Sequence, residues 1–214
     1  MNDREQTQFY RRLESARREV ELAEARGDRL EIADALKALG NILRRPPFGR
    51  DEANEVYARA AEIYRELDRP LDEAWVKRHI GINHEYAGRL AEAERFYDDA
   101  LSLYRQHSQA DDLNYANAVR YPAVIKQRLG KIEESTRLWE EAYDRYSTVH
   151  PNGLGEGVAE AAAWLTIFAI DAGDRELADK WFARASAASR ESQDADTHKF
   201  IAEVRRRFED KFNG

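Results

Sequence analysis

Cysteine is absent from this chain of 214 residues, and proline and glycine are scarce, at 5 and 11 residues. Without cysteine the chain can form no disulfide, no thiolate nucleophile and no cysteine-ligated zinc site. This absence fits a reducing compartment. Too little proline and glycine is present for a disordered chain or for an all-β chain with many turns, and 43% of the residues are hydrophobic, so a sizeable core is expected.

Long apolar runs are also missing. The longest uncharged run, Ala161 to Ile170, falls well short of the ~20 apolar residues that a membrane span needs. The first residues, MNDREQTQ, are too polar to begin a secretory signal. We therefore expect a soluble, cytoplasmic protein without a membrane partner.

Positive charge is in deficit. The formal net charge is −7, although 35% of the residues are charged. A nucleic-acid-binding protein that acts through its whole surface normally carries a positive excess. Direct binding to nucleic acid is therefore not expected, although a local basic patch is compatible with this composition.

The sequence does contain a repeated pattern. Four segments each carry a small residue, an aromatic residue, a second small residue and usually a tyrosine, at offsets of four, three and four. These offsets place all four side chains on one face of a helix. The segments begin 40, 42 and 43 residues apart and contain Ala53, Tyr57, Ala60 and Tyr64; Ala93, Tyr97, Ala100 and Tyr104; Ser135, Trp139, Ala142 and Tyr146; and Ala178, Phe182, Ala185 and Ser189.

A second helix precedes each of these segments. A glycine lies five residues before the last three sets, at Gly88, Gly130 and Gly173, where a left-handed residue can end the preceding helix. Each preceding helix carries a small or slim residue among bulkier ones. These residues, which we call the notch residues, are Gly40, Gly81, Ala123 and Thr166. Each unit is therefore predicted to be a helical hairpin whose second helix packs its aromatic residue against the notch of the first.

With these residues the chain resembles the tetratricopeptide repeat (TPR) family. Leu39-Gly40, Ile80-Gly81, the turn glycines and the alanine–aromatic sets carry the resemblance, which covers about residues 29–192. The period near 42 residues, and His150-Pro151 before the fourth unit, resemble the longer repeats of kinesin light chains, since the usual TPR period is about 34 residues.

The resemblance implies an all-α fold, a right-handed superhelical solenoid of antiparallel helical hairpins with about ten helices. We expect a single domain over 1–214. Four hairpins should span 29–67, 71–107, 111–147 and 153–192, between a covering helix in 1–27 and a capping helix in 194–213.

The two end helices have one apolar stripe each. Such stripes should cover the faces that terminal repeats leave open. The first stripe has a spacing near 3.5 residues, which would also suit a coiled-coil homodimer. The stripes consist of Phe9, Leu13, Ala16, Val20 and Ala23, and of Phe200, Ile201, Val204, Phe208 and Phe212.

Catalytic and metal-binding patterns are lacking. His79 and His84 are five residues apart and point about 140° away from each other on a helix, whereas a helical metal pair needs a spacing of three or four. We expect His84 to lie in or near the core and His79 to face a groove. No phosphate-binding loop, nucleophile elbow or HExxH motif occurs in the sequence. No catalytic residue, metal or cofactor is therefore predicted, and the protein is not expected to be an enzyme.

In TPR-like solenoids the first helices of successive hairpins line the concave side, and the resemblance thereby implies which residues face a groove. Across the first three hairpins these positions hold six basic residues and two acidic ones, namely Lys37, Arg44, Arg45, Arg78, Arg120 and Arg128, and Asp34 and Glu85. Arginine and aromatic residues dominate binding energy at interfaces, and Arg and Lys pair well with carboxylates. The predicted groove residues are Lys37, Asn41, Arg44, Trp75, Arg78, His79, Glu85, Tyr86, Asn117, Arg120, Tyr121, Gln127, Arg128 and Trp164.

These residues predict a non-catalytic protein–protein interaction scaffold that binds an acidic or C-terminal peptide segment. Two alternatives stay open, a ligand-responsive regulator that acts through a partner and an enzyme with an unrecognised site. Pro122 is also open to two interpretations. It lies inside a predicted helix and either kinks that helix or, with Tyr121, contributes to the groove.

Overall fold

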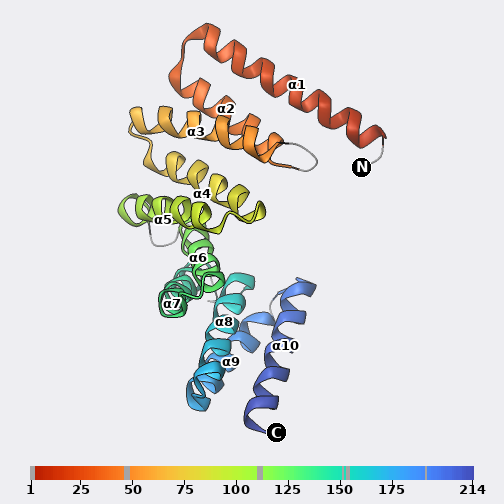
Figure 1. Cartoon of the computed structure of the whole chain (residues 1–214), viewed down its shortest axis with the longest axis vertical. Helices are drawn as coiled ribbons and strands as arrows, with labels where there is room; N and C mark the ends of the chain where they lie inside the picture. The colour runs from red at the N-terminus through yellow and green to blue at the C-terminus, as the bar shows by residue number, and fades with distance from the viewer. Residues whose placement is uncertain (1–2, 46–48, 110–112, 151, 153–154, 191) are drawn as a thin grey trace. The chain divides into compact units, whose positions relative to one another are not determined.

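The computed structural model describes residues 3–45, 49–109, 113–150, 152, 155–190 and 192–214. Within these ranges the regular structure consists of ten helices and no strand (Figure 1), which confirms the predicted all-α class. The helices are α1 (Asp3–Arg26), α2 (Arg29–Leu43), α3 (Arg50–Glu66), α4 (Pro70–Tyr86), α5 (Leu90–His107), α6 (Leu113–Arg128), α7 (Ile132–Val149), α8 (Glu156–Ala172), α9 (Arg175–Ser189) and α10 (Ala195–Phe212).

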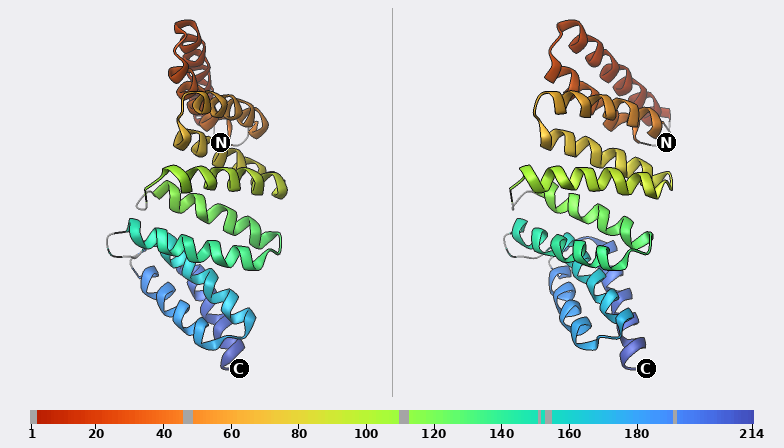
Figure 2. Two further views of the ribbon diagram at one scale, coloured as in Figure 1. Left: turned by 90° about the vertical axis from the view of Figure 1, so that its left-hand side faces the viewer. Right: turned by 60° about the vertical axis from the view of Figure 1, so that its left-hand side comes forward.

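The chain divides into two compact units, an N-terminal unit over 1–107 and a C-terminal unit over 108–214. The N-terminal unit contains α1 to α5, and the C-terminal unit contains α6 to α10. Consecutive helices within each unit pack side by side as antiparallel pairs (Figure 2). The hairpins α2–α3, α4–α5, α6–α7 and α8–α9 are called repeats 1 to 4 below. The expectation of one continuous domain over 1–214 stays a prediction.

Turn glycines end α4, α6 and α8, as the sequence predicts. Gly88, Gly130 and Gly173 have φ angles of 74°, 75° and 75°, a left-handed conformation that costs a glycine little. The next helix then begins within two residues. At α9 the carboxylate of Asp174 accepts a hydrogen bond from the backbone N–H of Leu177, which satisfies one of the free donors of the first turn.

The aromatic residues of repeats 1 and 2 fill the glycine notches. Tyr57 is completely buried and Tyr97 is 1% exposed. A Cβ atom added to Gly40 would lie 2.5 Å from the Tyr57 ring, and one added to Gly81 would lie 2.6 Å from the Tyr97 ring. Only glycine permits approaches this close, so the helices of each hairpin are locked together by these pairs.

In the C-terminal unit the pattern holds in repeat 3 and changes in repeat 4. Trp139 is completely buried, as predicted. Phe182 is only half-buried and stacks on Phe208 of α10, with ring centroids 5.8 Å apart. Its neighbour Trp181 is the buried aromatic residue, at 8% exposure. On the side away from repeat 3 the fourth repeat contacts a single capping helix, so Phe182 faces α10 while Trp181 packs against Tyr143 of α7.

The end helices lie where covering helices are expected. In α1, Leu13, Val20 and Ala23 are buried in the same core as repeat 1. An ion pair between Arg17 and Glu52, at 2.7 Å, joins α1 to α3 as well. In α10 the buried residues are Ile201, Val204 and Phe208, and this helix packs against α8 and α9. The apolar stripe of each end helix is therefore used within its own unit.

Candidate functional site

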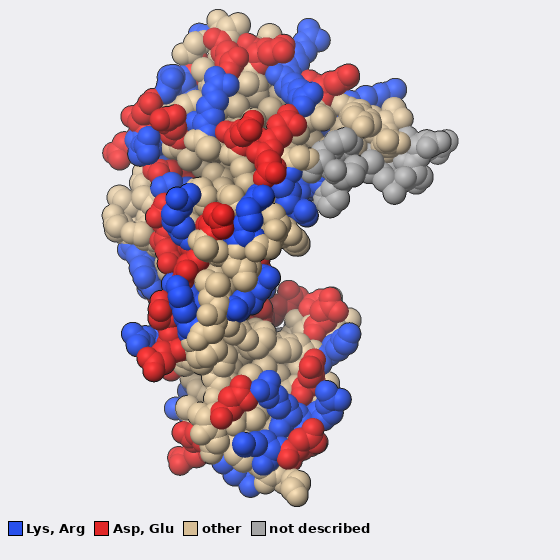
Figure 3. All heavy atoms as spheres, viewed as in Figure 1, with Lys and Arg blue, Asp and Glu red and all other residues tan. Residues whose placement is uncertain are grey.

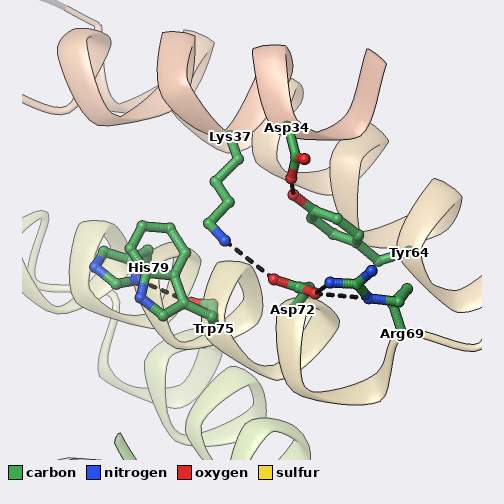
Figure 4. A network of polar contacts seen from close by, with 7 residues as sticks. All are labelled: Asp34, Lys37, Tyr64, Arg69, Asp72, Trp75 and His79. Carbon is green, nitrogen blue, oxygen red and sulfur yellow. Dashed lines mark hydrogen bonds and ion pairs between the residues drawn. The ribbon is translucent and has the colours of Figure 1, made fainter. Parts of the chain in front are cut away.

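The first candidate site lies in the N-terminal unit, where α2 and α4 present polar side chains to each other. We call it the α2–α4 face and define it by Lys37, Asn41, Arg44, Trp75, Arg78 and His79. All six belong to the predicted groove. Figure 4 shows part of this face, with Lys37 reaching from α2 toward α4.

Lys37 is held by a carboxylate that the prediction did not include. Its Nζ lies 3.1 Å from Asp72 Oδ1 and 4.9 Å from the centre of the Trp75 ring. The other oxygen of Asp72 accepts hydrogen bonds from Arg69, whose Nη2 is 2.7 Å away. One carboxylate therefore serves two cations, and it neutralises only one of them (Figure 4).

His79 is a buried, neutral part of this face. It is 7% exposed and stacks on Trp75 with ring centroids 3.6 Å apart. Its Nδ1–H donates a hydrogen bond to the Trp75 carbonyl oxygen at 2.8 Å. Burial lowers the pKa of His79 to about 3, and the positive charges of Arg78, Arg44 and Lys37 act in the same direction. A base with this pKa cannot act as a proton shuttle near neutral pH.

His79 should make the N-terminal unit sensitive to mild acid. An unfolded histidine binds a proton near pH 6.5, whereas the folded His79 binds one only near pH 3. The unfolded state therefore holds more protons between these values, and stability is lost as the pH falls, by at most about 1.4 kcal/mol per pH unit. We expect His79→Gln to make the free energy of unfolding depend less steeply on pH between pH 7 and pH 5.

The control for this prediction is His107→Gln. His107 is exposed at the end of α5, so His107→Gln removes a histidine away from the α2–α4 face, and the two variants are compared in urea denaturation series at matched pH. His84 contributes with the same sign, because burial and Arg89 lower its pKa as well. Equal slopes for the wild type and His79→Gln would contradict the burial of a neutral His79.

Arg44 is the cation of this face without a carboxylate. Its Nε atom is buried and has no hydrogen-bond partner among the described residues, and its guanidinium forms no ion pair with them. The three nearby residues outside the described ranges, Pro46, Pro47 and Phe48, carry no charge. Arg44 is thus available to a ligand that brings acceptors.

Three predicted groove residues are committed to tyrosine hydroxyls. Tyr57 donates a hydrogen bond of 2.8 Å to Asn41, and Tyr97 donates one of 2.7 Å to Glu85. In the C-terminal unit, Asn117 accepts one of 2.8 Å from Tyr146. A buried hydroxyl needs such a partner, so these acceptors are part of the scaffold whether or not they also contact a ligand.

His84 and Tyr86 lie at the end of α4. His84 is half-buried, stacks on Phe96 at 5.3 Å and accepts a hydrogen bond from Arg89, as expected for a residue near the core. Tyr86 is 71% exposed, and the guanidinium of Arg50 lies 4.7 Å from its ring centre. Tyr86 is therefore a surface residue at the end of α4.

In the C-terminal unit, Arg120 of α6 is paired with an acidic residue of the next repeat. Its Nε and Nη2 donate hydrogen bonds of 2.6 and 3.0 Å to the two oxygens of Glu160. Burial alone would lower the pKa of Arg120, but the hydrogen bonds and charge of Glu160 outweigh this effect and raise it. Tyr121 lies beneath this pair, with its ring centre 5.4 Å from the guanidinium.

A cavity of about 750 Å³ opens beside the Arg120–Glu160 pair. Its walls come from α6, the end of α7, the beginning of α8 and the segment before α10. Among the predicted groove residues it brings together Asn117 and Arg120. Sequence reasoning did not identify the other polar residues of its wall, which include Tyr146, His150, Glu156 and Ser192.

The remaining predicted residues of this unit lie elsewhere on α6 and α8. Gln127 is half-buried and Arg128 is exposed at the end of α6, and neither lines the cavity. Trp164 is half-buried between Trp139, at 6.2 Å, and Phe200 of α10, at 5.1 Å. Pro122 lies buried inside α6, so it faces the core of the hairpin.

No group of three or more histidine, aspartate or glutamate residues within the described ranges could hold a metal ion. Nor is any described helix both long and apolar enough to cross a bilayer.

Comparison with solved structures identifies the architecture as a TPR-like helical repeat fold, as the sequence predicts. BtubC (BKLC) from P. vanneervenii is 20% identical, with a TM-score of 0.74 over 93% of this chain and 84% of that one. A signal transduction ATPase (STAND) with a tetratricopeptide repeat sensor from Pyrococcus horikoshii is 16% identical, with a TM-score of 0.73 over 88% of this chain and 29% of that one. Kinesin light chain TPR-like repeats from Podospora anserina give a TM-score of 0.63 at 11% identity over 98% and 92%.

Sequence comparison is less informative. No protein-family model matches the chain. The RxLR effector protein SFI4 of Phytophthora infestans is 27% identical over 121 residues, which are 53% of this chain and 32% of that protein. The chain therefore spans about a third of the length of the curated relative it matches. The solved structures establish the fold of the chain, and a fold by itself does not assign a function.

Proposed function

We propose that this protein is a non-catalytic scaffold whose α2–α4 face binds an acidic peptide segment of a partner protein. The observation that carries the proposal is the convergence of positive charge on one buried ring. Burial is the main cause of the lowered pKa of His79, and Arg78 of α4, Lys37 of α2 and Arg44 at the end of α2 each lower it further. A face with this much positive potential favours a ligand that carries carboxylates.

The charge balance of the face supports the same ligand class. Lys37, Arg44 and Arg78 act on the His79 ring, and a fourth cation, Arg69, lies beside Asp72 at the beginning of α4. The carboxylates among them are Asp72, which is shared by Lys37 and Arg69, and Asp34, which accepts a hydrogen bond from Tyr64 at 2.6 Å. Asp72 is thus shared and Asp34 is hydrogen-bonded, whereas Arg44 forms no ion pair with a described residue, so Arg44 is the cation best placed to engage a new carboxylate.

Trp75 supplies the apolar part of the site. It is half-buried, with one neighbour in His79 and another in Lys37. A partly exposed indole that is held by its neighbours loses little entropy when it is covered, and such residues are common at the centre of interfaces. The preferred peptide therefore combines acidic residues, or its own C-terminal carboxylate, with one apolar side chain.

Replacing Arg44 tests this proposal without breaking an ion pair of the described fold. We expect Arg44→Gln to weaken the binding of a glutamate-rich peptide with a free carboxyl terminus by about tenfold, the worth of one charge-assisted hydrogen bond. Fluorescence anisotropy of a labelled peptide at low salt measures this change. Raising the salt to about 0.5 M should weaken binding to the wild type as well, because exposed charges become screened.

The matched control is Arg18→Gln. Arg18 is an exposed arginine of the same unit on α1, and its removal changes the net charge equally without touching the α2–α4 face. Equal losses in the two variants would show a non-specific charge effect. The proposal would also be overturned if the wild-type chain bound an all-glutamine, C-terminally amidated peptide as tightly as the glutamate-rich peptide.

A second candidate function is a ligand-responsive regulator that acts through a partner. It is favoured by one comparison, because the P. horikoshii protein is described as a signal transduction ATPase with a TPR sensor. A small molecule that raises the melting temperature of the chain, through preferential binding to the folded state, would support this candidate over the peptide scaffold.

A further inference from the structure

The cavity of the C-terminal unit differs in chemistry from the α2–α4 face. It measures about 750 Å³, within the usual size range of ligand sites. A second hollow of about 310 Å³ shares Arg120, Glu156 and Glu160 with it and extends to the beginning of α10. The two hollows thus adjoin at these three residues, and together they are called the recess below.

Negative charge predominates in this recess. Arg120 is the one lysine or arginine among the described residues that line the recess. The Nε and Nη2 atoms of Arg120 already donate hydrogen bonds to Glu160. Glu156, Asp194 and Asp196 add three further carboxylates. Figure 3 shows acidic side chains beside the beginning of α10. The neighbouring Glu191, which lies outside the described ranges, brings no positive charge either.

Not all of these carboxylates are explained by the fold. Asp194 caps α10, where it accepts a hydrogen bond of 2.7 Å from the backbone N–H of Thr197. Glu156 and Asp196 lie in the first turns of α8 and α10, where the helix dipole favours an acidic residue. Both residues are exposed and border the recess, and their carboxylates form no hydrogen bond or ion pair with any described side chain.

The recess also offers a buried polar side chain with unused capacity. Ser192 is 8% exposed and lines the larger hollow. Its Oγ accepts a hydrogen bond from the backbone N–H of Asp194 at 3.0 Å, while its own O–H donates to no described residue. A peptide carbonyl is the kind of acceptor that this hydroxyl lacks.

We infer that this recess is a second binding site, which takes a cationic group, the ammonium or guanidinium of a lysine or arginine side chain of a bound peptide. Glu156 and Asp196 accept hydrogen bonds from the cation, and Ser192 donates to the peptide backbone. The aromatic rings of Tyr146 and Phe200 line the walls and pack against the aliphatic stem. The site is independent of the α2–α4 face and has the opposite sign.

The experiment compares three probes on the full chain by isothermal titration calorimetry. They are an N-acetylated, C-amidated glycine-rich peptide with one arginine, the same peptide with citrulline, and free spermidine. We expect the arginine peptide to bind at least about tenfold more tightly than its neutral citrulline isostere, since a charge-assisted contact is lost. Stronger binding of spermidine than of the peptide would overturn the assignment to a peptide side chain and give the cation site to a free polyamine.

Variants locate the binding in the recess. Glu156→Gln combined with Asp196→Asn should weaken the arginine peptide by about tenfold or more. The matched control is Glu176→Gln. Glu176 lies exposed in the first turn of α9, away from the recess, so this substitution also removes a favourable interaction with a helix dipole. Equal binding of the arginine and citrulline peptides, or an unchanged affinity in the double variant, would overturn the inference. Peptide binding to the α2–α4 face is measured separately and is not affected by either result.

Discussion

Trp139→Ala should lower the free energy of unfolding of the C-terminal unit by about 3–5 kcal/mol, the usual cost of truncating a fully buried large aromatic side chain. Trp139 is completely buried and stacks on Trp164 at 6.2 Å. It joins α7 to α8, so its loss opens a cavity between repeats 3 and 4. Because a whole domain is stable by only about 5–15 kcal/mol, this variant should lose a large fraction of its stability.

Phe182→Ala is the matched comparison for this prediction. The sequence pattern places Phe182 at the equivalent position of repeat 4, but it is only half-buried. Its truncation should therefore cost clearly less than that of Trp139. Urea unfolding followed by circular dichroism measures both values. Equal losses in the two variants would show that the sequence pattern, and not the observed burial, determines the energetics.

Gly81→Ala should destabilise the N-terminal unit by about 1–3 kcal/mol, as expected for overpacking of a filled core. The sign is the informative part, because glycine to alanine inside a helix normally stabilises it by about 1 kcal/mol. Here a Cβ would lie 2.6 Å from the ring of Tyr97. That ring is 1% exposed and tied to Glu85 through its hydroxyl, so it cannot move aside cheaply.

The same result is expected at the first notch. Gly40→Ala should be destabilising as well, since its Cβ would lie 2.5 Å from Tyr57. Combining Gly81→Ala with Tyr97→Leu removes the ring edge and should recover part of the loss, which a double-mutant cycle detects. An increase in melting temperature for either single variant would contradict the close packing of helix pairs.

The fold could be predicted because the repeated pattern is a direct consequence of packing. Alanines at fixed offsets and an aromatic residue between them must share one helix face, and Gly40 and Gly81 leave room for that residue on the partner helix. The turn glycines were predictable for a similar reason, since their left-handed φ angles are strained in other residues. Repeat 4 departs from the pattern because α10, rather than another hairpin, packs on it, and the identity of a neighbour is not encoded in the local pattern.

The candidate site was less predictable. Counting charges on the first helices indicated a cationic face, but Lys37 is balanced by Asp72 and Arg120 by Glu160. These partners are 35 and 40 residues away in sequence, and no helical periodicity connects them. The sequence does contain one indication of which residues accept hydrogen bonds from the tyrosine hydroxyls. Asp34 and Asn117 occupy the same position, six residues before the notch residue, and each accepts a hydrogen bond from the last tyrosine of its repeat.

The central claim is that the α2–α4 face recognises acidic peptides, and the indole N–H signals of the four tryptophans test it most directly. In a titration of the wild-type chain with a glutamate-rich peptide, followed by NMR spectroscopy, we predict that the Trp75 signal shifts. The signals of Trp139 and Trp181, which are buried in the C-terminal unit, should stay in place. A titration that leaves Trp75 unchanged at millimolar peptide, or that shifts only the tryptophans of the C-terminal unit, would contradict the claim.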